Sequence, residues 1–214
     1  MKKKYWAFLI GSWCLSVGMQ AAKVDTLSVH SDAMNKEVQV ITICPDKAMA
    51  GEKCPVLYLL HGYGGNAGTW LGIKPELPQI ADKEGIIFVC PDGKNSWYWD
   101  SPLNKEYRYE TFVSKELVNY IDKNFTTKVE RGGRAITGLS MGGHGSLWLS
   151  IRHKDVFGGG GSMSGGLDIR PFPNNWEMKK QLGEEASNKQ RWDEHTVINQ
   201  LDKIKNGDLA VIID

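Results

Sequence analysis

The order of apolar and polar residues predicts two kinds of strand. Residues 24–30 and 37–43 alternate apolar with polar, the period of two that half-exposed antiparallel strands show. Residues 55–60 and 86–90 are almost continuously apolar, which is typical of strands covered by helices on both faces. The pattern therefore predicts an edge hairpin beside a buried sheet.

Helical periodicity appears after these strands. Residues 75–83 are expected to form a crossover helix, and residues 110–125 repeat apolar side chains at helical spacing. Residues 208–214 are expected to form a further buried strand. Strands that alternate with helices indicate a parallel sheet.

The chain is less regular between residues 158 and 205. Residues 158–164 form a glycine-rich strand, expected where packing is close or where the backbone passes near a site. Residues 170–205 are polar, with expected helices at 174–182 and 187–201. They form either a cap beside a pocket or surface helices that cover the sheet.

A sharp chain reversal is expected at Ser140. Residues 135–137 favour a strand, a helical pattern follows, and GLSMG between them matches G-x-S-x-G. Glycine at 138 and 142 permits a strained turn that lifts the hydroxyl out of the sheet. The N-terminus of the next helix directs its positive end and Met141 N–H to the place where an oxyanion would form. The motif favours acyl transfer; the alternative is an ordinary glycine-rich strand-to-helix turn.

A second glycine-rich loop follows the first buried strand. Residues 59–70 read LLHGYGGNAGTW, and an HG-x-GG loop at a strand end can present a backbone N–H to an oxyanion. We expect this donor to be Tyr63 N–H, paired with Met141 N–H. His61 is expected to brace the loop rather than to transfer protons.

Composition indicates one globular domain behind an export signal. The chain has 214 residues, 41% hydrophobic and 24% charged, with a formal net charge of +1 that gives no basis for nucleic-acid binding. Lysines, an apolar run and small residues follow one another in residues 1–21, the layout of a secretory signal peptide, with a domain over residues 22–214. A membrane anchor or a core strand is the alternative for this run, and stable membrane insertion is not expected. The chain has no zinc, Walker or dinucleotide motif, so we expect no metal and no cofactor.

Three cysteines would remain after signal cleavage. Cys44 and Cys54 bracket an expected turn; an exported protein could bridge them, and two free thiols are the alternative. Cys90 closes an apolar strand and is expected to be buried.

On these motifs the chain resembles the α/β-hydrolase serine esterases of the esterase D, S-formylglutathione hydrolase and feruloyl or acetyl esterase type. The likeness runs through LLHGYGG (59–65), CPDG (90–93), SWYWDSP (96–102) and GLSMGGHGSL (138–147). It implies an α/β-hydrolase fold, with a mostly parallel sheet, helices on both faces and an N-terminal antiparallel edge hairpin.

The resemblance also implies roles for individual residues. Ser140 would be the nucleophile, and the N–H groups of Tyr63 and Met141 would form the oxyanion hole. His144 would be structural. Trp97 and Tyr98 would line the acyl or alcohol pocket, or else cover the sheet edge.

The partners of the serine are not visible in the sequence. A serine needs a histidine to take its proton and an acid to orient that histidine, and in this fold both follow the serine. His153 is expected on the surface, about 20 Å from the serine at 1.5 Å per helical residue. His195 lies in a helix-like segment with Asp193 and Glu194 and is the less favoured alternative as a substitute base. We therefore expect the triad acid and histidine, with the last strand and helix, beyond residue 214 of a C-terminally incomplete hydrolase domain.

These observations predict a secreted or periplasmic serine carboxylesterase that hydrolyses short-chain acyl, acetyl or feruloyl esters, some of them linked to polysaccharide, through an acyl-enzyme on Ser140. A thioester such as S-formylglutathione is less expected, because export removes the protein from the cytosolic glutathione pool. The alternatives are a non-catalytic carbohydrate-binding protein that uses residues 97–99, and an acyltransferase of the same fold. The oligomeric state stays open.

Overall fold

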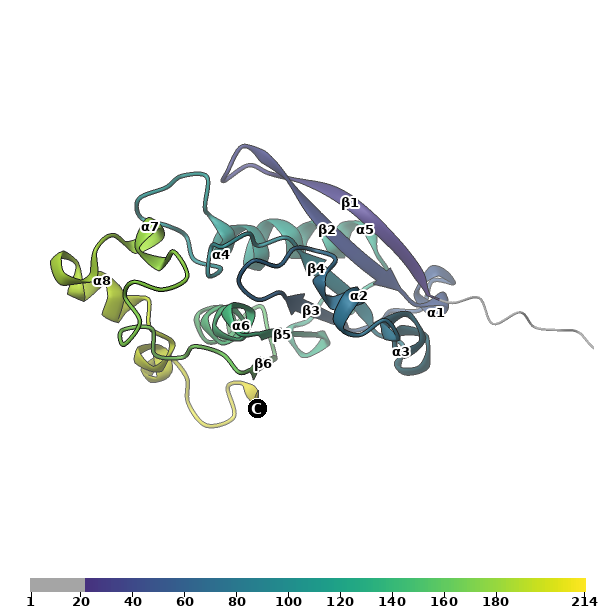
Figure 1. Cartoon of the computed structure of the whole chain (residues 1–214). Coiled ribbons are helices and arrows are strands. Elements are labelled where there is room, and N and C mark those ends of the chain that lie inside the picture. Colours follow the sequence, from purple (N-terminus) through teal and green to yellow (C-terminus); the bar gives the residue numbers. More distant parts are fainter. Residues whose placement is uncertain (1–21) are drawn as a thin grey trace, which may run out of the picture.

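The computed structural model describes residues 22–214, so the expected signal peptide over residues 1–21 lies outside the described residues. The described residues form a seven-stranded sheet in the order β1-β2-β4-β3-β5-β6-β7 (Figure 1). The strands are β1 (Lys23–Ser31), β2 (Lys36–Cys44), β3 (Val56–Leu60), β4 (Ile87–Pro91), β5 (Arg134–Leu139), β6 (Gly159–Met163) and β7 (Ala210–Ile213). The helices are α1 (Asp46–Met49), α2 (Thr69–Ile73), α3 (Leu77–Glu84), α4 (Tyr109–Thr111), the π-helix η1 (Phe112–Leu117), α5 (Val118–Asn124), η2 (Arg131–Gly133), α6 (Met141–Arg152), α7 (Met178–Leu182), η3 (Glu185–Ser187), α8 (Lys189–Glu194) and η4 (Val197–Lys203).

Strand direction confirms the expected α/β-hydrolase architecture. β1 pairs antiparallel with β2, and β2 antiparallel with β4, whereas β4, β3, β5, β6 and β7 are all parallel. In the register of β3 and β5, Leu60 lies opposite Gly138. The carboxyl ends of these two strands therefore meet at one edge of the sheet, where open α/β sheets place their ligands.

Helices cover the sheet on both faces. Successive residues of a strand point to opposite faces, and in β3 Tyr58 belongs to the core cluster that contains residues of α5 and α6, whereas Leu59 belongs to the cluster that contains Trp70 of α2 and Leu77 of α3. The continuous apolar character of β3 thus reflects burial on both sides, as predicted.

Several helices differ in detail from the prediction. The helix expected over residues 110–125 is divided into α4, η1 and α5, and within it Ser114 Oγ donates to the Glu110 carbonyl at 2.7 Å. The buried residues of η1, Phe112, Val113, Ser114 and Leu117, keep an ordinary helical spacing, so periodicity alone did not reveal the π-helix. The helix expected at 174–182 is shorter, as α7, and the one expected at 187–201 is divided into α8 and η4, which ends at Lys203. The helices α1 and α2 were not predicted.

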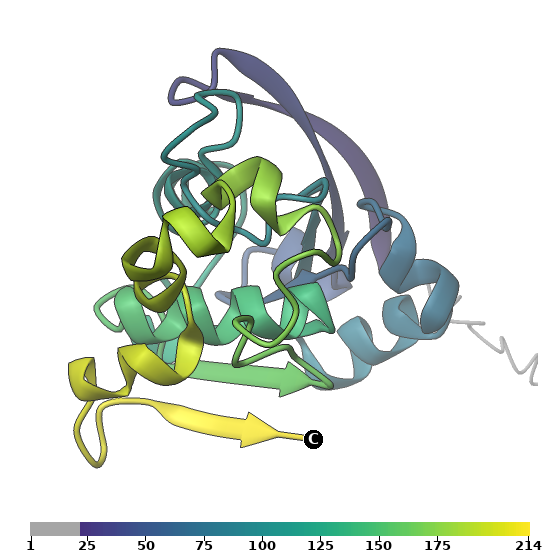
Figure 2. The same ribbon diagram turned by 60° about the vertical axis from the view of Figure 1, so that its left-hand side comes forward.

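The expectation of a buried last strand is wrong. Among residues 22–214, β7 lies at the edge of the sheet and pairs with β6 alone (Figure 2). Val211, Ile212 and Ile213 are 43%, 76% and 62% exposed, because no described helix covers them.

The sequence left open whether Cys44 and Cys54 are bridged and whether a segment of the chain enters a membrane. Cys44 and Cys54 are free and buried, and Cys90 is buried as expected. Burial raises the pKa of all three thiols. Between residues 22 and 214, no helix combines the length and apolar character needed to cross a membrane.

Candidate active site

Ser140 occupies the turn between β5 and α6, where its side chain is exposed. Its backbone has φ 55° and ψ −115°, which non-glycine residues rarely adopt. Close backbone contacts explain the flanking glycines. A Cβ on Gly138 would lie 2.3 Å from the Gly142 carbonyl oxygen, and a Cβ on Gly142 would lie 2.2 Å from the Leu60 carbonyl oxygen. The motif therefore produces an accessible hydroxyl on a strained turn.

Two backbone N–H groups border Ser140 from different elements. Met141 is the first residue of α6, so its N–H lies outside the helix's own hydrogen bonds. The loop over residues 61–65, here called the donor loop, runs beside the serine, because a Cβ on Gly62 would lie 3.6 Å from Ser140 Cβ. Tyr63 N–H, next along this loop, donates to no other backbone group among residues 22–214. Neither N–H group therefore has a backbone acceptor among the described residues.

The loop after β4 holds the donor loop in place. Gly93 N–H donates to His61 Nε2 at 2.9 Å, and His61 Nδ1 lies 2.7 Å from the Gly62 carbonyl oxygen. Asn95 Oδ1 accepts from Gly64 N–H at 2.9 Å, and Tyr98 OH donates to the His61 carbonyl at 3.1 Å. Both imidazole nitrogens of His61 are engaged, so this histidine braces the loop, as expected.

A pocket of about 210 Å³ opens beside Ser140 and is called the Ser140 pocket. Most of its lining is apolar or aromatic, which suits an acyl group. The lining residues are Tyr63, Trp97, Ser140, Ser164, Gly165, Gly166, Asp168, Ile169, Phe172, Trp176 and Met178. Its one charged group, Asp168, is paired with Arg170 at 2.8 Å.

The two aromatic residues expected to touch substrate have different places. Trp97 lines the Ser140 pocket. Tyr98 does not line it, because its fully buried ring fills the space left by Gly93 and Gly145, where a Cβ would lie 2.3 Å from the ring. The prediction for Tyr98 is therefore corrected. With Trp97 3% exposed and Trp99 fully buried, residues 97–99 also offer no open aromatic surface to a carbohydrate.

The segment between β6 and β7 has both roles that the sequence left open. Phe172, Trp176 and Met178 form one wall of the Ser140 pocket. Farther along, Trp192 and Val197 are buried in the core cluster that also contains residues of α6, and the segment lies beside α6 in Figure 2. The first part is therefore a cap, and the second covers the body of the protein.

The imidazole rings of the chain's five histidines, all within the described residues, have hydrogen-bond partners other than the Ser140 hydroxyl. His153 is not the surface residue we expected, because its Nε2 lies 2.8 Å from Oε1 of the buried Glu110. His195 stacks on Trp148 with ring centroids 5.4 Å apart, and its Nδ1 lies 2.7 Å from the Arg191 carbonyl oxygen. Neither can take the serine proton in this arrangement.

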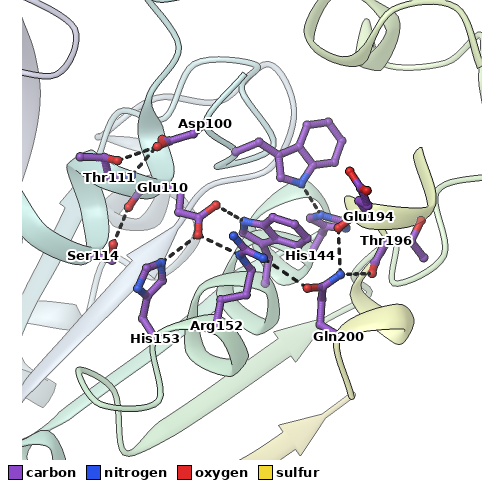
Figure 3. A network of polar contacts seen from close by, with 12 residues as sticks. Asp100, Glu110, Thr111, Ser114, His144, Arg152, His153, Glu194, Thr196 and Gln200 are labelled. Carbon is purple, nitrogen blue, oxygen red and sulfur yellow. Dashed lines mark hydrogen bonds and ion pairs between the residues drawn. The ribbon is translucent and has the colours of Figure 1, made fainter. Parts of the chain in front are cut away.

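His144 connects Gly166, in the lining of the Ser140 pocket, to Trp99, in the loop after β4. Trp99 Nε1–H donates to His144 Nε2 at 2.9 Å (Figure 3), and His144 Nδ1 lies 2.8 Å from the carbonyl oxygen of Gly166, which lines the Ser140 pocket. Complete burial lowers the pKa of His144 to about 4, so the ring is neutral and its Nδ1–H donates to Gly166. His144 is therefore structural, as the resemblance implied.

The sequence analysis missed Asn95, Trp176 and Glu177. Asn95 Nδ2 donates to Glu177 Oε2 at 3.5 Å, and Trp97 Nε1–H donates to the Trp176 carbonyl at 3.3 Å. Asn95 follows a buried strand at the sheet edge where ligands bind, a signal that could have identified it. No local pattern marks Trp176 or Glu177, whose φ values of 48° and 56° depend on the folded chain.

Comparison with known proteins agrees with this geometry. Residues 31–214 match the model of the Esterase family, described as "Putative esterase". The chain is similar to an acetyl esterase of Caldicellulosiruptor saccharolyticus, at 29% identity over 151 residues that cover 67% of this chain and 56% of that protein. It is also similar to an endo-1,4-beta-xylanase/feruloyl esterase of Xylanibacter ruminicola, at 34% identity over 124 residues that cover 54% of this chain and 17% of that protein.

A solved structure shares the fold. The fluorophosphonate-binding serine hydrolase F of Staphylococcus aureus, in its substrate-bound form, superposes with a TM-score of 0.76 at 20% identity, covering 91% of this chain and 79% of that one. The match to the acetyl esterase spans little more than half of that relative's length. Because the family model covers residues 31–214, the chain belongs to the Esterase family.

Proposed function

We propose that this chain carries the nucleophile and the oxyanion hole of a serine carboxylesterase. The observation that supports the proposal most is the exposed Ser140 on a strained turn, between the donor loop, which carries Tyr63 N–H, and the start of α6, which carries Met141 N–H. Donors fixed in this way stabilise an oxyanion without reorganising during the reaction.

The reaction follows from these positions. Ser140 Oγ attacks the ester carbonyl while its proton passes to a general base, and the carbonyl oxygen becomes an oxyanion that accepts hydrogen bonds from Tyr63 and Met141. Collapse of the tetrahedral intermediate breaks the bond to the alcohol oxygen, which leaves with the proton from the base. Water then attacks the acyl-enzyme by the same route, which releases the acid and restores the hydroxyl.

We place the general base and its acid partner outside these 214 residues. Each histidine is either bonded to another group or stacked away from the Ser140 pocket. A histidine beyond residue 214, with a preceding acid, remains the expected source, because the fold places both after the serine.

The proposed substrates are short-chain acyl, acetyl or feruloyl esters. The apolar and aromatic lining of the Ser140 pocket suits an acyl chain or a flat aromatic acyl group. Two relatives are named as an acetyl esterase and a xylanase/feruloyl esterase, which favours the same substrate class.

Ser140→Ala tests the proposal in the longest natural form of the protein, with p-nitrophenyl acetate as substrate. We expect hydrolysis to fall by about 10⁴-fold or more, as when a serine nucleophile is removed. Ser187→Ala, in the exposed η3, is the control and should keep normal hydrolysis. Unchanged hydrolysis by Ser140→Ala would refute the proposal, and acyl transfer to an added sugar in preference to water would favour an acyltransferase.

We also propose that the protein is secreted or periplasmic, on the basis of the signal-like residues 1–21. Expression of the whole reading frame followed by fractionation and N-terminal sequencing tests this. Cleavage near residue 21 in the exported fraction supports the proposal, and an intact N-terminus in the cytosol contradicts it.

A further inference from the structure

The donor loop contains a tight turn that sets the direction of Tyr63 N–H. Gly65 N–H donates to the Gly62 carbonyl at 3.0 Å, and of the two residues between them only Gly64 has a positive φ, 75°, the mark of a type II turn. Tyr63 N–H belongs to the same peptide as the Gly62 carbonyl, and the two point in opposite directions because the peptide is planar and trans. The closed turn therefore directs the oxyanion donor.

Asn95 holds the middle peptide of this turn. Its Oδ1 accepts from Gly64 N–H at 2.9 Å across 31 positions of sequence. Type I and type II turns differ in the orientation of this middle peptide. Gly64 is exposed, so water can satisfy its N–H in either orientation once the Asn95 amide is removed. Asn95 thus favours one form of the turn over the other.

The other end of the Asn95 amide is bound to the cap beside the Ser140 pocket. Asn95 Nδ2 donates to Glu177 Oε2 at 3.5 Å, and Lys180 forms an ion pair with the other oxygen of Glu177. If the amide oxygen and nitrogen were exchanged, donor would face donor at Gly64 and acceptor would face carboxylate at Glu177. The two contacts together therefore fix how the amide is turned.

Two further contacts join the same segments. Trp97 Nε1–H donates to the carbonyl of Trp176, which precedes Glu177 in the cap. Desolvation raises the pKa of Tyr63, and the negative charge of Glu177 raises it further, so the phenol of the donor loop also lies near this carboxylate. The cap, the loop after β4 and the donor loop thus converge on Glu177 and Asn95.

We propose that Asn95 is a positioning residue for the oxyanion hole, and that Glu177 of the cap holds Asn95 in place for this role. The inference rests on the proposed esterase function and deepens it. Asn95 does not line the Ser140 pocket and acts through Gly64. Its effect falls on kcat, because an oxyanion hole binds the transition state more strongly than the ester.

Asn95→Leu tests this role in the longest natural form of the protein, with p-nitrophenyl acetate as substrate. Leucine has a similar size but offers Gly64 N–H no acceptor. Loss of a whole oxyanion donor costs about 10²–10³-fold in kcat. Tyr63 N–H remains but is less well directed, so we expect kcat to fall by about 30-fold with KM within about twofold. The urea midpoint of unfolding should not change, because water replaces the acceptor of the exposed Gly64.

Asn104→Leu is the matched control. Asn104 Oδ1 also accepts from a backbone N–H, that of Glu106, at 2.9 Å in the same loop between β4 and α4. Asn104 lies outside the lining of the Ser140 pocket. This variant should keep the wild-type kcat and KM.

Exchange of donor and acceptor separates positioning from packing. Asn95→Asp keeps an acceptor for Gly64 N–H but sets a carboxylate against Glu177, so kcat should fall by about tenfold at neutral pH. Glu177→Gln keeps an acceptor for Asn95, and kcat should stay within about threefold of wild type. The double variant Asn95→Asp/Glu177→Gln restores both hydrogen bonds with donor and acceptor exchanged, and its kcat should return to within about threefold of wild type.

Three results would overturn the inference: a wild-type kcat in Asn95→Leu, a rise in KM that accounts for its whole loss of kcat/KM, or a double variant no faster than Asn95→Asp. Ser140→Ala, assayed beside these variants, tests the esterase proposal itself. If Ser140→Ala is inactive while Asn95→Leu keeps the wild-type kcat, this inference alone fails. If Ser140→Ala still hydrolyses the ester, the esterase proposal fails, and this inference fails with it.

Discussion

At the scale of single residues, Gly142 sets how closely α6 approaches β3 and the donor loop. Ala at this position would place Cβ 2.2 Å from the Leu60 carbonyl oxygen and 2.7 Å from that of His61. Both contacts are with backbone, so the helix itself must move. We expect Gly142→Ala to lower the free energy of unfolding by about 1–3 kcal/mol and ester hydrolysis by about 100-fold, measured by denaturant titration and initial rates.

Gly72 provides the control for this prediction. It lies in α2, and a Cβ there would meet no atom within 4 Å. Gly72→Ala should therefore leave hydrolysis unchanged and raise the free energy of unfolding by about 0.5 kcal/mol, through restriction of the unfolded chain. If Gly142→Ala and Gly72→Ala had the same stability and the same rate of ester hydrolysis, the close approach of α6 to β3 and the donor loop would not matter to the site.

The residues of the site differ in how far sequence could identify them. Ser140 and the donor loop belong to short motifs whose geometry is set by local glycines. Asn95 and Glu177 meet only because distant loops converge, and His153 was placed on the surface because its partner, Glu110, lies 43 residues away in sequence. Contacts between separate elements leave no periodic trace in a single chain.

At the scale of elements, Glu110 joins α4 to α6. It is 8% exposed and accepts hydrogen bonds from three groups of α6 and its end (Figure 3). These are Trp148 Nε1–H at 2.9 Å, Arg152 Nε–H at 2.8 Å and His153 Nε2 at 2.8 Å. Burial opposes ionisation of Glu110, but the hydrogen bond from His153 and the charge of Arg152 outweigh it and hold its pKa below the usual value.

Glu110→Gln tests this link between the two helices. Gln keeps one neutral acceptor oxygen but loses the charge, and its NH₂ group faces donors where a second oxygen accepted, so we expect the free energy of unfolding at pH 7 to fall by about 2–3 kcal/mol. A lowered folded-state pKa means that the carboxylate stabilises the protein above its unfolded pKa of about 4.3 and ceases to do so as the pH falls through the folded value. The difference between wild type and variant should therefore shrink below about pH 4.

Denaturant titrations at a series of pH values measure this difference. Glu130→Gln, at an exposed position, is the control and should change the free energy of unfolding by less than about 0.5 kcal/mol. If the free energies of unfolding of wild type and Glu110→Gln differed by the same amount from neutral to acid pH, the Glu110 carboxylate would not be the stabilising group.

Helices and strands could be predicted from the sequence where buried positions recur at a regular spacing along the chain. β1 and β2 alternate and β3 and β4 are continuously apolar, because these patterns record which faces are covered. The division of residues 109–124 into α4, η1 and α5 was not predicted, since it depends on packing against other elements. The short helices after β6 carry weak periodicity and were overestimated in length.

At the scale of the whole molecule, the described residues leave one part of the sheet uncovered. A cavity of about 510 Å³ runs along β5, β6 and β7, and its lining includes Leu57, Ala135 and Ile212. α2 and α3 cover this face only over the neighbouring strands. In the 214-residue chain, an exposed apolar face of this kind favours association with other molecules.

Ile212→Lys should therefore reduce self-association of the 214-residue chain. Ile212 is 76% exposed, so a lysine there is hydrated and adds a charge that opposes edge-to-edge pairing. Leu103→Lys is the matched control, because Leu103 is 54% exposed in the loop between β4 and α4, away from this face. Sedimentation velocity over a range of protein concentrations should show fewer oligomers for Ile212→Lys alone. Equal association of both variants and wild type would mean that the uncovered face does not drive contact between molecules.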